Sequence, residues 1–295
     1  MGLILEHTPQ PYIAGFWRRS FAFLIDLIVV GLCCLCISGI FKSQIIAHPI
    51  IFALLGYALV VAYYGLCNSS LNQGQTLGKT LLKVKVIHSS GDYLSVPQSL
   101  LRAAIVYAPI CLLSACQFIG SALISTLLSF IFVVIYAWTL YLYIFNKNNR
   151  RSLHDYAANS IVVNADVAIQ PIQVLWKGHY IFISIITALC IFYFVADHQS
   201  LKHLSSGSAH LNELQSKQPN IIKILNVSQD ISDQDHKASM HMYTLYVNKY
   251  ALLYTPDFVQ SFAQHLDQAD PNILSEDNMV WVGLQAGYQF GLATK

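Results

Sequence analysis

Long apolar runs, interrupted by short charged segments, dominate the first two thirds of the chain. A run of about 20 apolar residues is long enough to cross a bilayer as a helix. Residues 103–145 carry no charge over about twice that length, so we expect this run to fold back near Gly120 and to form two spans. The expected membrane helices cover residues 21–41, 49–67, 103–119, 122–145 and 180–196.

The composition points the same way. Hydrophobic residues make up 55% of the chain and charged residues 11%, and the mean hydropathy is +0.49. A water-soluble fold of this length rarely needs so much apolar surface, so we expect the excess to face lipid. The formal net charge of only +2 gives no reason to expect a nucleic-acid partner.

The pattern changes after residue 197, where polar stretches and histidines replace the apolar runs. Residues 221–227 and 240–247 are rich in side chains that favour strands, and residues 279–292 predict one or two more. We therefore expect residues 198–295 to form a small soluble α+β domain.

A helix is expected between these strands. Residues 255–257, with the sequence Thr-Pro-Asp, are typical of the start of a helix. Its buried stripe would consist of Phe258, Phe262 and Leu266. The chain thus divides into a membrane domain with a four-helix core (1–165), a connector with a fifth membrane helix (166–197) and the soluble domain (198–295).

Lysine and arginine cluster in alternate connections between the expected spans. They precede the first span and lie between the second and third and between the fourth and fifth, whereas the opposite side receives only Lys42 in its short loops. Positive loops stay in the cytoplasm, so we expect a bacterial-type plasma (inner) membrane protein with a cytoplasmic N-terminus and an extracytoplasmic C-terminal domain. Candidates for interfacial anchors, or for simple packing residues, are Trp17, Tyr63, Tyr64, Trp138 and Tyr141.

Asp26 lies inside the first expected span. A carboxylate at the centre of a membrane helix costs about 2.5–3.5 kcal/mol on insertion scales unless it is compensated. Arg19 is about 10 Å away along the helix axis, too far for a comfortable ion pair, so the partner should come from another helix. Arg102 and residues 150–155 are the candidates. Two interpretations stay open, a structural ion pair and a proton or cation site.

Three blocks of the sequence resemble the RDD family of membrane proteins, named for an arginine and two aspartates. Residues 14–26 resemble its first-helix signature, residues 74–86 its loop motif, and residues 151–155 its closing motif. The resemblance covers about residues 11–165 and implies a membrane bundle, with ion or small-solute transport suggested for the family and sodium/proton exchange for some members. Carried across residue by residue, the three eponymous positions are Arg19, Asp26 and Asp155.

The loop motif has a superficial similarity to a phosphate-binding loop. The spacing between its glycines is one residue too short, Gln73 occupies a required glycine position, and a membrane span rather than a strand precedes it. We therefore expect no nucleotide at this loop. The residues that carry the cytoplasmic loop motif are Gly74, Thr76, Gly78 and Lys79.

We expect this loop to lie on the membrane surface instead. Residues 76–82 would run along the bilayer, and residues 83–96 would form a hairpin that turns at residues 89–92. This arrangement would direct lysine side chains toward lipid phosphates. The lysines concerned are Lys79, Lys83 and Lys85.

Other site chemistries find no support in the sequence. The seven cysteines all lie in apolar runs, so they predict packing residues and no disulfide framework for the soluble domain. The histidines after residue 197 show no metal-site spacing, and no nucleophile elbow is present. We therefore predict no metal, no cofactor and no enzymatic activity.

Two functions remain in competition. The charge network of Arg19, Asp26, Arg102 and Asp155 favours movement of ions or small solutes across the bilayer, and the family resemblance implies protons and sodium among the ions. Four core spans without a visible inverted repeat are few for a transporter, and a homo-oligomer could supply the rest of a pathway. The alternative is a membrane anchor or assembly factor that presents residues 198–295 to an extracytoplasmic protein partner. An intramembrane enzyme would need paired carboxylates or a histidine cluster, and only Asp26 clearly lies within a span.

Overall fold

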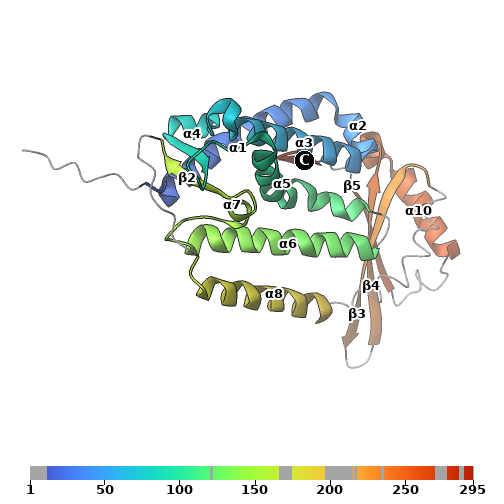
Figure 1. Cartoon of the computed structure of the whole chain (residues 1–295). Coiled ribbons are helices and arrows are strands. Elements are labelled where there is room, and N and C mark those ends of the chain that lie inside the picture. Colours follow the sequence, from blue (N-terminus) through green and yellow to red (C-terminus); the bar gives the residue numbers. More distant parts are fainter. Residues whose placement is uncertain are drawn as a thin grey trace, which may run out of the picture.

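The computed structural model describes residues 12–119, 122–165, 175–196, 215, 218–233, 236–269, 278–285 and 289–294. Its largest part is a bundle of apolar helices. A short two-stranded sheet and a three-stranded sheet lie at opposite ends of these helices (Figure 1).

The helices of the bundle lie near the expected spans. They are α1 (Phe16–Ile40), α3 (Pro49–Cys67), α5 (Val96–Leu112), α6 (Ala122–Phe145) and α8 (Gly178–Ala196), and the short helices α2 (Lys42–Ala47) and η1 (Ser70–Asn72) follow α1 and α3. Within the described residues, α1, α3 and the Ile124–Phe145 part of α6 are long and apolar enough to cross a membrane. α5 and the Gly178–Phe192 part of α8 are apolar but shorter. The membrane bundle is therefore confirmed, whereas the number of five spans stays a prediction.

The prediction of a helix over residues 103–119 is wrong in its bounds. α5 begins earlier, because Ser95 and Gln98 form a capping box and a proline occupies the first turn. A 3₁₀ helix, η2 (Ser114–Phe118), replaces the last residues of the expected span. As a result, Arg102 lies within α5 and not before a membrane helix.

A two-stranded sheet lies at the end of the bundle where α1 begins (Figure 1). The elements at this end are α4 (Leu77–Leu81), β1 (Val84–His88), α7 (Leu153–Ala157) and β2 (Ser160–Asn164). β1 pairs with β2 in antiparallel fashion, so the expected hairpin within residues 83–96 is wrong. The pairing buries Val84 and Val86 together with Val162 and Ala14, and a local surface hairpin could not provide such a core.

The C-terminal region contains a sheet and a helix, as the sequence predicts. β3 (Ile221–Asp233), β4 (His236–Val247) and β5 (Asn278–Gln285) form the sheet, and η3 (Tyr250–Tyr254) and α10 (Pro256–Ala269) follow β4. β3 is antiparallel and β5 parallel to the central strand β4. Phe262 and Leu266 of α10 are buried against Tyr243 and Leu245 of β4, with Phe258 partly buried beside them. The predicted stripe of α10 is therefore confirmed.

The last described residues return to the membrane bundle. β6 (Gln289–Phe290) and β7 (Ala293–Thr294) form a hairpin that contacts α1 and α3, and the C-terminus lies among the helices in Figure 1. Gly291 is buried at φ 57°, where an added Cβ would lie 2.8 Å from Cys34 Sγ and 3.1 Å from the carbonyl oxygen of Gly56. Leu292 packs against the cluster that contains Cys34 and Val60. The end of the chain thus contributes to the core of the bundle.

Candidate functional site

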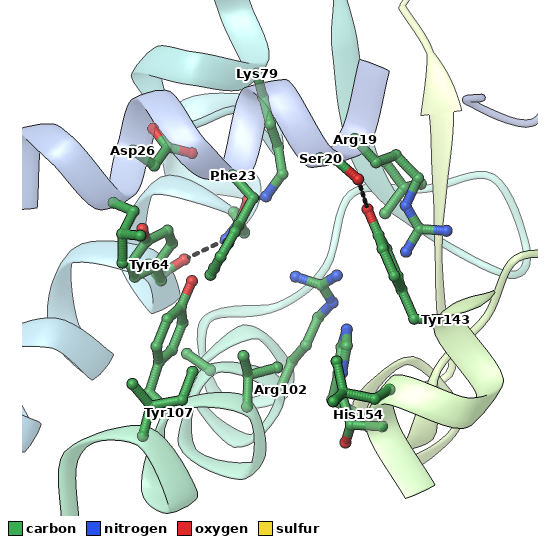
Figure 2. Close-up of a pocket in the computed structure, with 18 of the residues that line it drawn as sticks. Arg19, Ser20, Phe23, Asp26, Tyr64, Lys79, Arg102, Tyr107, Tyr143 and His154 are labelled. Carbon is green, nitrogen blue, oxygen red and sulfur yellow. Dashed lines mark hydrogen bonds between the residues drawn. The ribbon is translucent and has the colours of Figure 1, made fainter. Parts of the chain in front are cut away.

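A cavity of about 430 Å³ lies inside the bundle, near the two-stranded sheet. Helices α1, α3, α5 and α6 form most of its walls, and α4, α7, β1 and β2 add one side chain each (Figure 2). Most lining groups are apolar or aromatic. The ionisable side chains other than tyrosine that line it are Arg19, Asp26, Lys79, Arg102 and His154.

Asp155 forms an ion-pair cluster beside the cavity. The side chain is fully buried in the first turn of α7. Its carboxylate accepts a hydrogen bond from Arg102 Nε at 3.0 Å and forms ion pairs with Arg102 Nη2 at 2.9 Å and Arg19 Nη2 at 3.4 Å. The backbone N–H of Ser152 and the hydroxyl of Ser160 donate to it at 3.0 Å each. One carboxylate therefore compensates two buried arginines.

The charges of this cluster fix its protonation. Burial alone would raise the pKa of Asp155, but His154, Arg102 and Arg19 outweigh that effect and hold the pKa well below its usual range. Burial lowers the pKa of His154 to about 3, although Asp155 opposes the shift. The imidazole is therefore neutral at pH 7, with Nε2 3.5 Å from the carboxylate. Among the described residues, Nδ1 of His154 has no hydrogen-bond partner.

Asp26 has a different set of partners. Its carboxylate accepts hydrogen bonds from the hydroxyl of Thr76, the backbone N–H of Gly78 at 2.8 Å and the hydroxyl of Tyr63 at 3.3 Å. These three donors are called the Asp26 socket below. Within the described part of the chain, no lysine or arginine lies at ion-pair distance from Asp26. The expectation that Arg102 or residues 150–155 compensate Asp26 is therefore wrong, because Arg102 binds Asp155 instead.

The loop motif explains how the socket comes so close to α1. Gly78 lacks a side chain, and a Cβ there would lie 2.2 Å from the carbonyl oxygen of Ala22 and 3.1 Å from Cγ of Asp26. Gly74 has φ 71°, and its Cβ would lie 2.0 Å from the carbonyl oxygen of Val86. Both glycines are therefore required for the close approach of backbone to backbone.

Lys79 points into the cavity (Figure 2). The expectation that it lies on the membrane surface and faces the phosphates there is wrong, because it points into the bundle, whereas for Lys83 and Lys85 that expectation stays a prediction. The ammonium group of Lys79 donates a hydrogen bond to Asn68 Oδ1, and Asn68 Nδ2 donates to the carbonyl oxygen of Tyr64 at 2.7 Å. Burial, followed by the charge of Arg102, lowers the pKa of Lys79 to about 7. This amine can therefore gain or lose a proton close to neutral pH.

Tyrosines supply much of the remaining polar lining. The rings of Tyr64 and Tyr107 stack with centroids 4.3 Å apart, and the hydroxyls of Ser20 and Tyr143 are 2.7 Å apart in a hydrogen bond. The sequence marks Tyr64 only as an interfacial anchor or packing residue and gives no role to the other three. The spacing of four residues between Tyr64 and Asn68 predicts that both lie on the same side of a helix, and this spacing could have identified them as a pair that lines the cavity.

The site therefore combines charged and hydroxyl groups inside an apolar wall. Such a cavity can hold a charged solute and exchange protons with it. The described residues contain no group of three or more histidine, cysteine, aspartate or glutamate side chains arranged to hold a metal ion.

Comparison with known proteins agrees with the three sequence blocks. Residues 13–159 match the RDD family. A relative, the uncharacterized protein YxaI of Bacillus subtilis (strain 168), is 34% identical over 110 residues, a match that covers 30% of this chain and 72% of that protein. No solved structure matches the chain. The matched region contains Asp26, Asp155 and most of the residues that line the cavity, and we conclude that the chain belongs to the RDD family of membrane proteins.

Proposed function

We propose that this protein transports an ion, such as a proton or sodium, or a small solute across a bacterial-type plasma membrane. The observation that carries the proposal is the cavity in which Asp26 and Lys79 lie without a direct ion-pair partner among the described residues. In this proposal the N-terminus and the cavity face the cytoplasm, and the three-stranded sheet with α10 lies outside. The proposal includes assembly into a homo-oligomer, which could supply the rest of a transport pathway.

The difference between fixed and variable charge supports a proton or ion site at Asp26. A carboxylate that only locks helices together gains most from permanent cations, as Asp155 does with its two arginines. Asp26 is held by neutral donors, and the cation that shares its cavity is Lys79, which can titrate near pH 7. The charge in this part of the cavity can therefore change as a solute or proton arrives.

Flux through proteoliposomes tests this proposal. The full chain would be reconstituted, and proton and sodium movements would be compared with those of Asp26→Asn. Asp92→Asn is the matched control, because Asp92 is exposed and, within the described residues, its carboxylate accepts a hydrogen bond from Ser90 Oγ alone, at 2.8 Å. We expect wild type and Asp92→Asn to conduct and Asp26→Asn to lose flux while retaining its fold. A folded Asp26→Asn protein with undiminished flux would refute the role of Asp26, a wild type that moves no ion would refute ion transport, and a wild type that moves no solute would refute the proposal as a whole.

The anchor hypothesis has one observation in its favour. Met242 of β4 and Trp281 of β5 are register partners, and they are 44% and 59% exposed. They lie on the sheet face opposite Tyr243, which packs against α10, because neighbouring residues of a strand point to opposite faces. An exposed apolar pair of this kind suits contact with a partner protein.

Point substitutions test the anchor hypothesis better than truncation. Removing the C-terminal region would also remove Gly291 and Leu292 from the bundle core. A photoreactive side chain at position 281 should form a discrete crosslink to one protein in intact cells, and Met242→Gln should weaken that crosslink. If position 281 crosslinks only to lipid, partner presentation through this pair is excluded.

A further inference from the structure

We infer that the cavity binds the phosphate headgroup of an anionic, lipid-like amphiphile that enters from the membrane between α1 and α6. The inference rests on the proposed function, since it names the class of solute for the same cavity. Three observations support it: the balance of charges around the cavity, the buried polar atoms without hydrogen-bond partners, and the position of the apolar walls.

The charges around the cavity favour an anion. Arg19, Lys79 and Arg102 are cationic, and Asp26 and Asp155 are the carboxylates among them. Asp155 is shared by both arginines, and Asp26 is already surrounded by its socket. With Lys79 protonated, this group of five carries one uncompensated positive charge in a poorly solvated space. A ligand with one negative charge, such as a phosphodiester, would neutralise it.

Two polar atoms around the same space lack partners. Among the described residues, His154 Nδ1 and the hydroxyl of Thr139 are buried without a hydrogen bond, whereas the hydroxyl of Tyr64 interacts with that of Tyr107. His154 and Tyr64 are 7% and 3% exposed, and both line the cavity. Figure 2 shows Arg102 and Lys79 pointing toward its centre. A buried polar atom without a partner is costly, and the oxygens of a phosphate group could accept from the hydroxyl of Thr139 and from Lys79 and Arg102.

The apolar side of the cavity faces the bilayer. Phe23 of α1 and Tyr136 and Leu140 of α6 line it and are 39%, 45% and 40% exposed. These exposed side chains belong to two apolar helices, so lipid chains have access to this side. Closer to the helix ends at the two-stranded sheet, the hydrogen bond between Ser20 and Tyr143 links α1 to α6. A free phosphate ion would gain nothing from such walls, whereas an acyl chain would bury its surface there.

The polar side lies at headgroup depth. Arg19 is in the first turns of α1 and Tyr143 is in the last turn of α6, so both lie at helix ends near the two-stranded sheet. The ends of membrane helices coincide with the interfacial region of a bilayer. A phospholipid could therefore place its phosphate beside Lys79 and Arg102 without leaving its leaflet.

Lipid binding to the full chain in phosphatidylcholine nanodiscs tests this inference. Spin-labelled phosphatidylglycerol is the probe, spin-labelled phosphatidylcholine is the neutral reference, and the immobilised fraction of each is measured. Lys79→Gln removes the cavity cation that has no ion-pair partner among the described residues, and Leu140→Trp fills the apolar side of the cavity. Lys83→Gln, at an exposed lysine, and Ile144→Trp, one turn further along α6 and 47% exposed, are the matched controls.

We expect the wild type to immobilise phosphatidylglycerol in preference to phosphatidylcholine. Lys79→Gln and Leu140→Trp should each lower its affinity by about tenfold, the effect of losing one charged hydrogen bond or the space for a chain. The two controls should bind like the wild type, and inorganic phosphate should not displace the lipid.

Three results would overturn the inference. They are equal binding of the two lipids, equal affinities for each variant and its control, and complete displacement by inorganic phosphate, which would identify a soluble anion instead. Ion flux separates this inference from the proposed function. Flux without lipid preference would refute only the amphiphile, and lipid preference without flux of any solute would refute only transport.

Discussion

The two buried aspartates of this protein have opposite surroundings. Asp155 is 0% and Asp26 is 1% exposed, so burial does not distinguish them. Asp155 binds two arginines, whereas Asp26 accepts hydrogen bonds from two hydroxyls and one backbone N–H. Both arrangements satisfy the carboxylate, but only the first uses permanent cations.

This difference separates a structural role from a functional one. An ion pair between buried groups is expensive to break, because each partner becomes an uncompensated charge. Neutral donors stabilise a carboxylate and leave its charge available to a mobile cation, a proton or a neighbouring lysine. We therefore expect substitutions around Asp155 to affect the fold and substitutions around Asp26 to affect mainly the solute.

The largest effect is expected from Asp155→Asn. The change keeps the volume but leaves Arg19 and Arg102 without their shared counter-ion, which should cost about 3–5 kcal/mol of stability. Thermal unfolding in detergent should show a large fall in Tm, and Asp92→Asn should show none. If Asp155→Asn and Asp26→Asn lower the Tm equally, the contrast between the two carboxylates is wrong.

Gly78→Ala should disturb the hydrogen bonds of the Asp26 socket and leave the ion pairs of Asp155 intact. The added methyl group would lie 2.2 Å from the carbonyl oxygen of Ala22, so α4 must move away from α1 and the socket must open. Overpacking of this kind costs about 1–3 kcal/mol. Gly39→Ala is the control, because nothing lies within 4 Å of a Cβ at that position. A Gly78→Ala protein as stable as Gly39→Ala would show that the loop does not need this close contact.

A smaller effect concerns the pH dependence of stability. The pKa of Lys79 is about 7 in the folded protein and lies below its usual value near 10.5, so the unfolded chain binds the proton more tightly. Stability should therefore rise with pH between these two values. Lys79→Gln should remove this part of the rise, with a change in Tm of about 2–4 °C for each kcal/mol lost. The difference between the two Tm curves is the measurement, because other groups titrate in both proteins. Parallel curves between pH 7 and 10 would show that Lys79 is not desolvated in the fold.

The sequence predicted the parts of the molecule that depend on local pattern. The apolar runs located α1, α3 and α6, and the three motif blocks contain some of the residues that line the cavity, among them Arg19, Asp26 and Lys79. The start of α5 lies outside the expected span because the capping signal of Ser95 and Gln98 precedes the uncharged run that marks the helix in the sequence.

Contacts between distant segments could not be read from the pattern. The partner of Asp26 depends on how deeply the loop that carries Gly78 inserts beside α1, and that depth is set by the pairing of β1 with β2. The return of Gly291 to the bundle likewise depends on space between α1 and α3. Neither periodicity nor charge in the C-terminal region marks this contact.

The smallest effect is expected from Tyr143→Phe, which bears on the membrane side of the cavity. The substitution removes the hydrogen bond to Ser20 and keeps the ring that lies under the guanidinium of Arg19 at 5.1 Å. The loss should cost only about 0.5–1.5 kcal/mol, and the Asp155 cluster should keep its ion pairs. Phosphatidylglycerol should exchange faster in this variant, because the link between α1 and α6 holds the two helices together where the lipid enters. Tyr136→Phe, on the same helix, controls for the loss of a hydroxyl. Slower or unchanged exchange in Tyr143→Phe would show that the lipid does not enter between α1 and α6 at this hydrogen bond.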